Sequence, residues 1–452
     1  MITLFPHQIE ALEQTKDFQN IAVYHDMGLG KTFTGSEMMI RFNHRVNLII
    51  CQKSKIQDWL DHLELYYTKS YYNYNLIYDL TDKNGLEAFL HVVSDLGYTQ
   101  RIFGVINYEL AWRRKELLKL KDFTLMLDES SLIQNPKAKQ SKFILKLKPA
   151  HCILLSGTPV GGKFENLWSQ CHLLGWDISE RLYSQQYVNW KTIEAGGMKH
   201  KIVDKENPYK NIDRLKSKMR QHGAIFKKTE EVVELPEQII TNVYVRPPAE
   251  YYSFMKDSIV EVHTGFFDHE VDAEWDGKTF DDVHELVGDT TLTKLLYARQ
   301  LCSQYNRNKL EAFEDLLKST QDRLIVFYNF NDELVRLKTI CQLCGRPTSE
   351  INGHRKDLTA YEQESNSVTL CQYQSASKGL NLQKCNKVIY FSLPLSSEDF
   401  EQSKKRVHRI GQNKTCFYYI LICRNSVEKN ILHTLEERKD FTDELFKTSC
   451  LC

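Results

Sequence analysis

Two series of short apolar runs, each alternating with helical patterns, constrain the fold of this 452-residue chain most strongly. The first series fills much of the N-terminal half, and the second begins at Leu324–Tyr328. Such alternation is typical of a parallel sheet whose strands are joined by crossover helices. The length allows two or three domains with full-sized cores. We therefore expect an α/β protein with two parallel-sheet lobes.

A glycine-rich loop follows the first apolar run. Ile21–Tyr24 predicts a strand that runs directly into the loop Met27-Gly28-Leu29-Gly30-Lys31-Thr32, after which a helix is predicted. Backbone amides at the start of such a helix bind phosphates, Lys31 would reach the β/γ oxygens, and the Thr32 hydroxyl would bind magnesium. The full phosphate-loop pattern is incomplete, because His25 stands where its first glycine would be. The strand–loop–helix context still predicts that the whole loop binds a nucleotide.

Acidic and hydroxyl side chains follow two further predicted strands. Phe123–Leu127 leads into Asp128 and Glu129, and Cys152–Leu155 leads into Ser156-Gly157-Thr158-Pro159. Asp128 would bind magnesium through water, and Glu129 would orient or deprotonate the attacking water. The hydroxyl residues could couple the state of the nucleotide to the other lobe. A loop, an acidic pair and hydroxyls in this order predict a site for a nucleotide and magnesium.

Two arginines stand in the segment Gln402–Gln412 near the C-terminus. Arg406 and Arg409 are three residues apart and would share one face if the segment is helical. They would supply positive charge to a transition state, whereas a charged surface helix is the alternative interpretation. Gly411 and Gln412 directly after them favour a specific role between the domains. A fold that brings both lobes around one nucleotide accounts for the distant loop and arginines together.

Candidate contacts to a nucleic-acid backbone follow several predicted strands. Lys53 and Asn107 come after apolar runs of the first half, and Ser375 and Lys378 belong to the polar segment Gln374–Leu382. Amides, hydroxyls and lysines at such positions suit phosphate contacts that fix register without reading sequence. For Lys53 and Asn107, an ordinary strand cap is an almost equally good interpretation.

Charge restricts where nucleic acid can bind. The chain has 59 basic and 59 acidic residues, so its formal charge is zero and any DNA contact must come from local clusters of lysine and arginine. One run of lysines is a candidate patch, although a solvated helix face is the more ordinary interpretation. Its members are Lys137, Lys139, Lys142, Lys146 and Lys148.

The two predicted lobes divide near residue 235. Residues 1–235 form the expected ATP-binding lobe, with a helical protrusion at about 177–235, where the strand rhythm is lost. Residues 236–452 form the expected second lobe, with a helical insertion at about 250–318. Within it, the acidic, glycine-broken stretch Asp268–Asp289 is expected to be an exposed loop. No hairpin that could act as a wedge between nucleic-acid strands is identifiable.

Cysteine usage and apolar runs exclude secreted disulfide scaffolds and membrane proteins. The 12 scattered cysteines form no dense framework, the N-terminus lacks a signal peptide, and no apolar run approaches the ~20 residues of a membrane span. We expect a cytoplasmic monomer, in a bacterial cell or a virus-infected host. Cys341 and Cys344 form one C-x-x-C without a second pair, which favours isolated thiols over a zinc site.

Together these segments resemble the Swi/Snf family of DNA-dependent ATPases, within the second superfamily of helicase-like motors. The most specific marks of the resemblance are Asp26–Thr32, Asn135–Lys139, Leu154–Pro159 and Gln402–Gln412. The resemblance implies two RecA-like lobes, the second a helicase C-terminal lobe, with ATP and magnesium as cofactors. It also implies double-stranded DNA as a partner bound without sequence preference. By the same likeness, Gln8 would read the adenine, and Arg406 and Arg409 would be arginine fingers.

The chain departs from the family in its acidic motif. Asp128-Glu129-Ser130-Ser131 lacks the histidine that is frequent at the fourth position, which would alter coupling to DNA more than hydrolysis. No chromatin-reading or nuclease module flanks the motor, as expected for a compact bacterial or viral form. We therefore predict an ATP-dependent translocase on double-stranded DNA. The alternatives are a strand-separating or branch-remodelling helicase in replication or recombination, and a nucleotide-gated DNA clamp or sensor.

Overall fold

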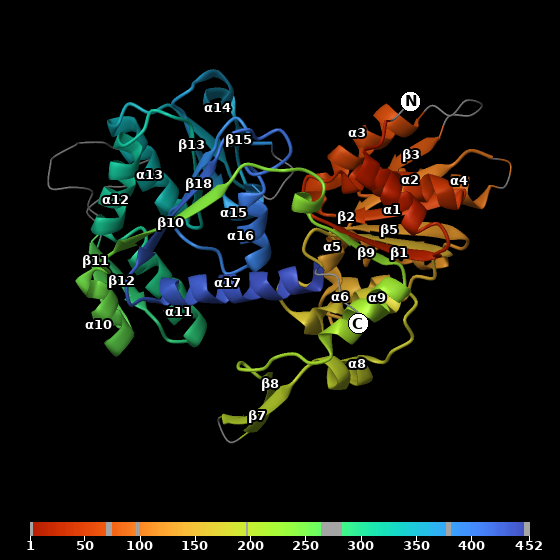
Figure 1. Cartoon of the computed structure of the whole chain (residues 1–452), viewed down its shortest axis with the longest axis horizontal. Helices are drawn as coiled ribbons and strands as arrows, with labels where there is room; N and C mark the ends of the chain where they lie inside the picture. Colours follow the sequence, from red (N-terminus) through yellow and green to blue (C-terminus); the bar gives the residue numbers. More distant parts are fainter. Residues whose placement is uncertain are drawn as a thin grey trace. The chain divides into compact units, whose positions relative to one another are not determined.

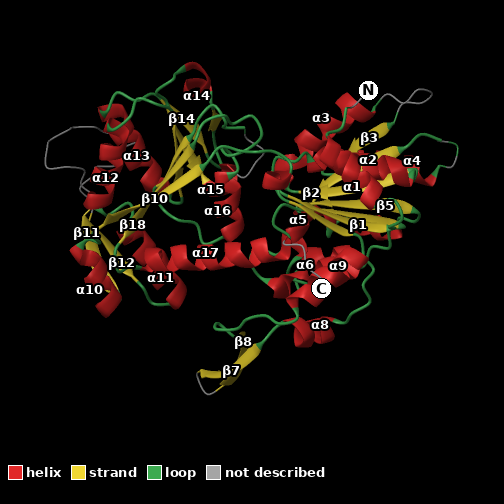
Figure 2. Ribbon diagram, viewed as in Figure 1, coloured by secondary structure: helices red, strands yellow, loops and turns green. Residues whose placement is uncertain are grey.

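The computed structural model describes residues 3–68, 75–95, 97, 99–195, 198–263, 283–376 and 381–446. Its contacts group the chain into two units, which we call the first lobe (residues 1–234 and 438–452) and the second lobe (residues 235–437). Each lobe contains a sheet with its own helices (Figures 1 and 2). The sequence placed the whole of 236–452 in the second lobe, whereas the end of helix α17 (Val427–Phe446) is grouped with the first.

The first lobe is built on a seven-stranded, fully parallel sheet with the strand order β3-β4-β2-β5-β6-β1-β9. Its strands are β1 (Asn20–His25), β2 (Val46–Cys51), β3 (Leu76–Asp79), β4 (Ile102–Asn107), β5 (Phe123–Asp128), β6 (His151–Leu155) and β9 (Ala224–Lys227). The strands predicted before the glycine loop, the acidic pair and the hydroxyl motif are β1, β5 and β6. Because these three are neighbours, their carboxyl ends bring the three motifs to one edge of the sheet.

Helices cover both faces of this sheet, which explains why its strands read as unbroken apolar runs. In β2, Leu48 and Ile50 belong to one core cluster, and Ile49 and Cys51 to the other. Helices α1, α2 and α3 contribute to the cluster of Ile49, and α5, α6 and α7 to that of Leu48. The helices are α1 (Pro6–Gln14), α2 (Lys31–Phe42), α3 (Ile56–Tyr67), α4 (Lys83–Ser94), α5 (Tyr108–Ala111), α6 (Lys139–Ile144), α7 (Trp168–Leu173), α8 (Glu180–Tyr187) and α9 (Ile212–Gln221).

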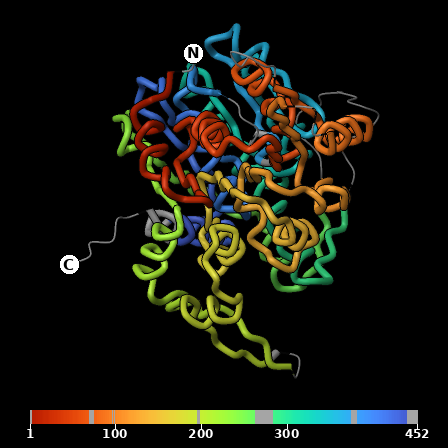
Figure 3. The backbone as a smooth tube through the Cα atoms, turned by 90° about the vertical axis from the view of Figure 1, so that its right-hand side faces the viewer, coloured from red at the N-terminus to blue at the C-terminus, as the bar shows by residue number. Residues whose placement is uncertain are grey.

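The region expected to be a helical protrusion contains strands as well as helices α8 and α9. Strands β7 (Trp190–Ala195) and β8 (Met198–Val203) form an antiparallel hairpin, which Figures 1 and 3 show extending away from the main sheet of this lobe. Strand β9 pairs in parallel with β1 and so belongs to the main sheet. The expectation of a helical or irregular segment is corrected here. Most side chains of the hairpin are exposed, so no apolar alternation marked its strands in the sequence.

The second lobe has a seven-stranded sheet of order β10-β18-β17-β13-β16-β14-β15, in which only the β14–β15 pairing is antiparallel. Its strands are β10 (Gln238–Val245), β13 (Leu324–Tyr328), β14 (Thr348–Ile351), β15 (Lys356–Asp357), β16 (Val368–Gln372), β17 (Lys387–Tyr390) and β18 (Cys416–Cys423). Its helices include α12 (Arg307–Lys318), α13 (Asn331–Leu343), α14 (Thr359–Gln363), α15 (Tyr373–Ala376) and α16 (Ser397–Lys404). The two sheets confirm the predicted α/β fold with two parallel-sheet lobes.

The insertion between β10 and β13 combines helices with a second hairpin. It contains α10 (Ala249–Asp257), β11 (Ile259–His263), β12 (Val283–Val287) and α11 (Thr291–Cys302), followed by α12. Residues 283–287, expected within an exposed loop, form β12 antiparallel to β11, and 264–282 lie outside the described residues.

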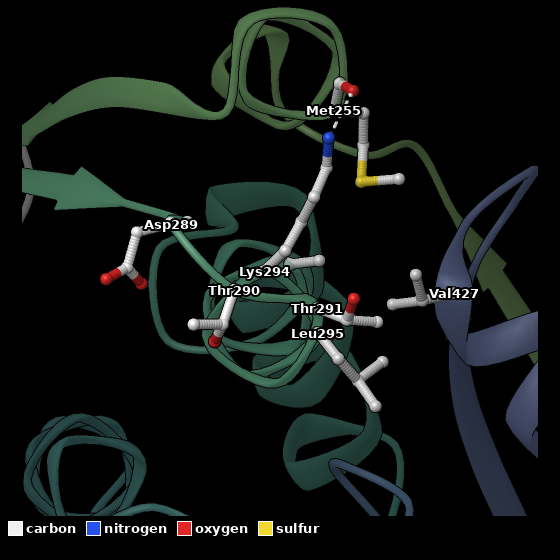
Figure 4. Close-up of a pocket in the computed structure, with 9 residues that line it drawn as sticks. Met255, Asp289, Thr290, Thr291, Lys294, Leu295 and Val427 are labelled. Carbon is white, nitrogen blue, oxygen red and sulfur yellow. Dashed lines mark hydrogen bonds between the residues drawn. The ribbon is translucent and has the colours of Figure 1, made fainter. Parts of the chain in front are cut away.

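A hollow of about 360 Å³ lies in this insertion (Figure 4). There Lys294 Nζ donates hydrogen bonds to the carbonyl of Met255 at 3.0 Å and to Ser258 Oγ at 2.9 Å. None of the predicted site residues lines it. Across the described chain, no helix combines the length and the hydropathy needed to cross a bilayer.

Candidate nucleotide site

The glycine loop joins the end of β1 to the start of α2. Gly28 and Gly30 have φ angles of +88° and +69°, a conformation that glycine adopts without steric cost. A Cβ at Gly30 would also lie 2.5 Å from Nε2 of Gln8. Helix α2 begins at Lys31, so the free backbone amides of its first turn lie at the end of the loop. The loop therefore has the geometry that an anion-binding helix start requires.

Lys31 and Asp128 lie in the same part of the site. Lys31 Nζ donates hydrogen bonds to the carbonyls of His25 at 2.8 Å and Asp26 at 3.1 Å. Burial raises the pKa of Asp128, while the hydrogen bond from Trp59 and the positive charge of Lys31 oppose that rise. Burial and the charge of Lys31 lower the pKa of His25 to about 3. The structure thus brings the predicted phosphate lysine and the predicted magnesium carboxylate together.

The acidic pair is held by groups from three other elements. The indole Nε1 of Trp59 donates to Asp128 Oδ2 at 2.9 Å, and the Tyr108 hydroxyl donates to the carbonyl of Asp128 at 2.9 Å. Glu129 has φ +54°, a left-handed conformation that is uncommon for residues other than glycine. Ser156 Oγ lies 3.5 Å from Oε2 of Glu129. Strained backbone of this kind persists where the surroundings fix it, and it is frequent at active sites.

Gln8, the predicted adenine reader, contacts the loop. Its Oε1 accepts a hydrogen bond from the Phe5 amide at 2.8 Å, and its Nε2 donates to the carbonyl of Gly30 at 3.0 Å. The neighbouring His7 Nε2 lies 2.9 Å from the carbonyl oxygen of Leu29. Gln8 is 2% exposed. These bonds fix the loop from α1, and adenine reading by Gln8 stays a prediction.

Gln170 on α7 links strand β1, the acidic motif and the hydroxyl motif. Its Oε1 accepts hydrogen bonds from the hydroxyls of Tyr24 at 2.9 Å and Ser130 at 2.8 Å, and its Nε2 donates to the carbonyl of Pro159 at 2.7 Å. These partners come from β1, from the acidic motif and from the hydroxyl motif. Sequence reasoning missed Gln170, Tyr108 and the contact of Trp59, because each acts through a tertiary contact that leaves no local pattern.

The oxygen donors at this edge suit a hard cation. The hydroxyl of Thr32 and the carboxylates of Asp128 and Glu129 are the ligand types that magnesium prefers, and it is commonly bound by only one or two carboxylates plus substrate phosphates. Thr32 and Asp128 therefore remain our candidates for holding it.

A second group of potential ligands in the described residues, Cys302, Cys423 and Glu428, is less suited to a metal. Lys309 Nζ lies 2.6 Å from Oε1 of Glu428, and the backbone amide of Cys423 donates to its Oε2 at 2.9 Å. Both carboxylate oxygens of Glu428 are thus already engaged. We interpret the group as a buried ion pair that joins α12 to α17.

The segment with the two arginines forms turns rather than a helix, and hydrogen bonds hold these turns in place. Helix α16 ends at Lys404, so the expectation that Arg406 and Arg409 share a helix face is wrong. Arg406 is 9% exposed. The guanidinium of Arg409 donates to Asn381 Oδ1, and burial lowers the pKa of Arg409. After α16 the chain continues in turns and bends, and Gly411 there has φ +97°.

Gln412 and His408 hold this turn from inside the second lobe. Gln412 Nε2 donates to the carbonyls of Gln383 at 3.1 Å and Cys385 at 2.9 Å, and its Oε1 accepts from the amide of Lys414 at 3.0 Å. His408 Nε2 lies 2.8 Å from the carbonyl oxygen of Pro236. The conformation of the arginine segment is therefore fixed by its neighbours, which suits arginines that must be preorganised for charge stabilisation.

The residues predicted to contact DNA differ in how exposed they are. Lys53 is exposed, in the short helix after β2. Asn107 is 2% exposed and donates to Glu109 Oε2 at 2.6 Å, and Ser375 is 6% exposed. Their burial is at odds with direct contact to a DNA backbone, because strand-end residues can equally well cap their own fold. Lys378 lies outside the described residues.

Many exposed basic residues lie between residues 113 and 148 of the first lobe, on and around α5 and α6. The guanidinium of Arg113 and Nζ of Lys139 lie 5.2 Å and 5.1 Å from the centre of the Trp112 ring, and α5 packs against α6. We call the exposed basic residues of this stretch the basic face. Its exposed members are Arg113, Lys115, Lys119, Lys121, Lys137, Lys139, Lys142, Lys146 and Lys148. Within the described chain, none of them forms an ion pair with an acidic side chain.

Comparison with known proteins gives two family matches. The model of the SNF2-related domain matches residues 8–306, and that of the helicase conserved C-terminal domain matches residues 308–411.

The individual relatives described here share less than a quarter of their residues with this chain. An uncharacterized ATP-dependent helicase of Mycoplasma genitalium is 24% identical over 75% of this chain and 32% of its own length. Another, YqhH of Bacillus subtilis, is 23% identical over 96% of this chain and 78% of its own length. The chain thus spans about a third of the Mycoplasma protein. The solved SWI2/SNF2 ATPase core of Sulfolobus solfataricus in complex with dsDNA has a TM-score of 0.44 and 20% identity, covering 98% of this chain and 92% of that one.

Proposed function

Since this chain belongs to the family of the SNF2-related domain, with a helicase C-terminal domain behind it, we propose that it hydrolyses ATP to move along double-stranded DNA. Both bacterial relatives described above are named ATP-dependent helicases, which supports ATP as the nucleotide. The observation that carries the proposal is the edge of the first sheet. There β1, β5 and β6 lie side by side and bring the glycine loop, the acidic pair and the hydroxyl motif together.

Each group at this edge has a role in the proposed reaction. The loop amides and Lys31 would bind the phosphates, and Glu129 would orient or deprotonate the attacking water. Magnesium, held by Thr32 and Asp128, would neutralise charge on the phosphates. Arg406 and Arg409 would supply positive charge to the transition state from the second lobe. Turnover would then depend on both lobes, as a motor that cycles between states requires.

The basic face supports DNA as the partner. The chain has no net charge, so a local group of exposed lysines and arginines is the feature expected of a protein that binds phosphate backbones. Contacts from lysine and arginine to phosphate oxygens carry no sequence information, which fits binding without sequence preference. Binding of this kind weakens steeply with salt, because each phosphate contact releases a counterion. A monomeric state and a cytoplasmic location stay predictions.

Strand separation is the second candidate activity. The β7–β8 hairpin, which the sequence did not reveal, extends from the first lobe and exposes Trp190 and Ile193. Exposed apolar side chains on an extended hairpin are suited to inserting between base pairs. A DNA clamp without useful turnover is the candidate of another class, and the complete set of predicted ATPase residues disfavours it.

ATPase activity measured with four nucleic-acid conditions tests the proposal. The full chain is assayed without nucleic acid, with single strands, with duplex and with branched DNA. We expect the strongest stimulation by duplex DNA. Stimulation by none of the three would favour the clamp, and stimulation by forks or single strands alone would favour the strand-separating helicase.

A charge-reversal variant tests the basic face in the same assay. Lys115→Glu combined with Lys119→Glu should weaken duplex binding and reduce the slope of log K against log salt by about 1 for each phosphate that the variant no longer neutralises. ATPase activity without DNA should be retained. Lys83→Glu is the matched control, because Lys83 is exposed in the same lobe but pairs with Glu87 at 3.6 Å. Equal effects of both changes would remove the basic face from the DNA site.

A further inference from the structure

The carboxylate of Asp128 accepts a hydrogen bond from a neutral donor. Nε1 of Trp59, from α3, donates to Oδ2 of Asp128 at 2.9 Å across 69 residues of sequence. Trp59 is 2% exposed, so water competes little for this hydrogen bond. An indole has one N–H and no acceptor, so it engages a single lone pair and leaves the other acceptor positions of the carboxylate for a ligand.

His62, which lies on α3 like Trp59, connects the Trp59 ring to α2. The ring of His62 packs edge-on against Trp59, with centroids 5.6 Å apart, and against Phe33 at 4.7 Å. His62 Nε2 also hydrogen-bonds Ser36 Oγ at 3.1 Å. Phe33 directly follows Thr32, the other predicted magnesium residue. The contacts therefore run from the helix that carries Thr32, through His62 and Trp59, to Asp128.

We infer that Trp59 is a positioning residue that holds Asp128 in the orientation required to bind the magnesium of MgATP. This inference rests on the proposed function. A neutral donor suits the task, because a lysine or arginine at the same place would orient the carboxylate but cancel the negative charge that attracts the cation. Outer partners of metal ligands commonly contribute 10–100-fold to metal affinity or activity. Trp59 would supply such a contribution without touching the metal or the nucleotide.

The alternative is that Trp59 only fills the core between α3 and the sheet. Trp59→Phe separates the two interpretations, because phenylalanine retains an aromatic ring at the position and lacks the N–H group. The matched control is Trp168→Phe. Trp168 lies in the same lobe and also donates its indole N–H, to the carbonyl of Ile178 at 2.8 Å, but it has no contact with Asp128.

The experiment measures equilibrium binding of a fluorescent ATP analogue to the full chain, first with a Mg²⁺ titration and then in EDTA. For Trp59→Phe we expect the half-saturating Mg²⁺ concentration to rise about 10–100-fold. Nucleotide affinity in EDTA should stay within about twofold of the wild type, and Trp168→Phe should behave as the wild type in both conditions. A purely structural loss would weaken binding equally with and without Mg²⁺.

An unchanged Mg²⁺ requirement in folded Trp59→Phe would overturn the inference while leaving the proposed function intact. Absence of Mg²⁺-dependent binding in the wild type would instead contradict the proposed function, and the inference with it. If Trp59→Phe does not fold, benzothienylalanine at position 59 replaces it, since this analogue has the bicyclic shape of tryptophan with sulfur in place of N–H. The same rise in the Mg²⁺ requirement is expected for it, and no rise overturns the inference.

Discussion

The hydroxyl of Ser130 lies 2.8 Å from Oε1 of Gln170, and the same oxygen accepts a hydrogen bond from Tyr24. All three side chains are buried. Ser130 directly follows Glu129, and Tyr24 lies on β1 just before the glycine loop. A single amide thus fixes the acidic motif relative to the strand that carries the loop.

Replacing Gln170 should therefore destabilise the first lobe. Gln170→Leu leaves the hydroxyls of Tyr24 and Ser130 and the carbonyl of Pro159 without this partner, and a buried unsatisfied group costs about 1–3 kcal/mol. We expect the free energy of unfolding to fall by at least that amount, measured by urea denaturation. Gln57→Leu, an exposed position on α3, should change it by less than about 0.5 kcal/mol. Equal unfolding midpoints for both variants would contradict this role of Gln170.

Lys31 and Glu129 should affect hydrolysis without removing DNA binding. Lys31→Ala is expected to abolish ATP hydrolysis, because in the proposed reaction its ammonium group binds the phosphates, while DNA binding without nucleotide survives. Glu129→Gln should bind ATP but hydrolyse it very slowly. Steady-state ATPase assays and DNA titrations check both variants. Parallel loss of DNA binding in folded Lys31→Ala would place Lys31 in the DNA site, and a near wild-type rate for Glu129→Gln would mean that another group positions the water.

The arginines of the second lobe should act on turnover far more than on ATP binding. Arginine fingers contribute ~10³–10⁵ in rate in phosphoryl transfer. Arg406→Ala and Arg409→Ala should each lower kcat by up to ~10³–10⁵-fold, with a much smaller change in nucleotide affinity. Arg424→Ala is the control, because this exposed arginine of the same lobe lies over the ring of Tyr244. Turnover within a few-fold of the wild type would exclude an arginine-finger role.

His25 should make the protein less stable in mild acid. Burial, followed by the charges of Lys31, His7 and Lys227, lowers its pKa to about 3, and Asp26 opposes this only in part. Because the folded pKa lies below the unfolded value of 6.5, the unfolded chain binds the proton first, and stability is lost as the pH falls from about 6.5 toward 3.

The comparison with His25→Gln isolates this contribution, since glutamine does not titrate. Between pH 7 and pH 5, the wild type should lose about 1–2 kcal/mol more unfolding free energy than the variant, because each pH unit below the unfolded pKa contributes at most about 1.4 kcal/mol. Urea denaturation at both pH values measures the difference. The same acid sensitivity in both proteins would show that His25 is not buried in its neutral form.

The sequence predicted the two parallel sheets well, because strands buried on both faces retain continuous apolar runs. Strand β2, buried along its whole length, is an example. The β7–β8 hairpin escaped prediction because Trp190, Ile193 and Met198 are exposed and no buried face imposes a pattern. The resemblance to the Swi/Snf family is confirmed by the SNF2-related match over residues 8–306.

The candidate site was predictable only as far as its motifs are local. The loop and the acidic pair are each formed by consecutive residues, and both lie where the strand ends meet. The partners that orient them are distant: Trp59 lies 69 residues from Asp128, and Gln170 lies 146 residues from Tyr24. Asn107 was assigned to DNA from its place at a strand end, but its amide donates to the fold itself.

The central claim is movement along duplex DNA, and triplex displacement tests it most directly. A third strand annealed to duplex DNA is incubated with the full chain and ATP, beside a forked duplex of matched length. We expect ATP-dependent release of the third strand while the duplex beneath it and the fork stay paired, and no release with Lys31→Ala. Efficient unwinding of the fork with an undisturbed triplex would contradict the account and establish a strand-separating helicase.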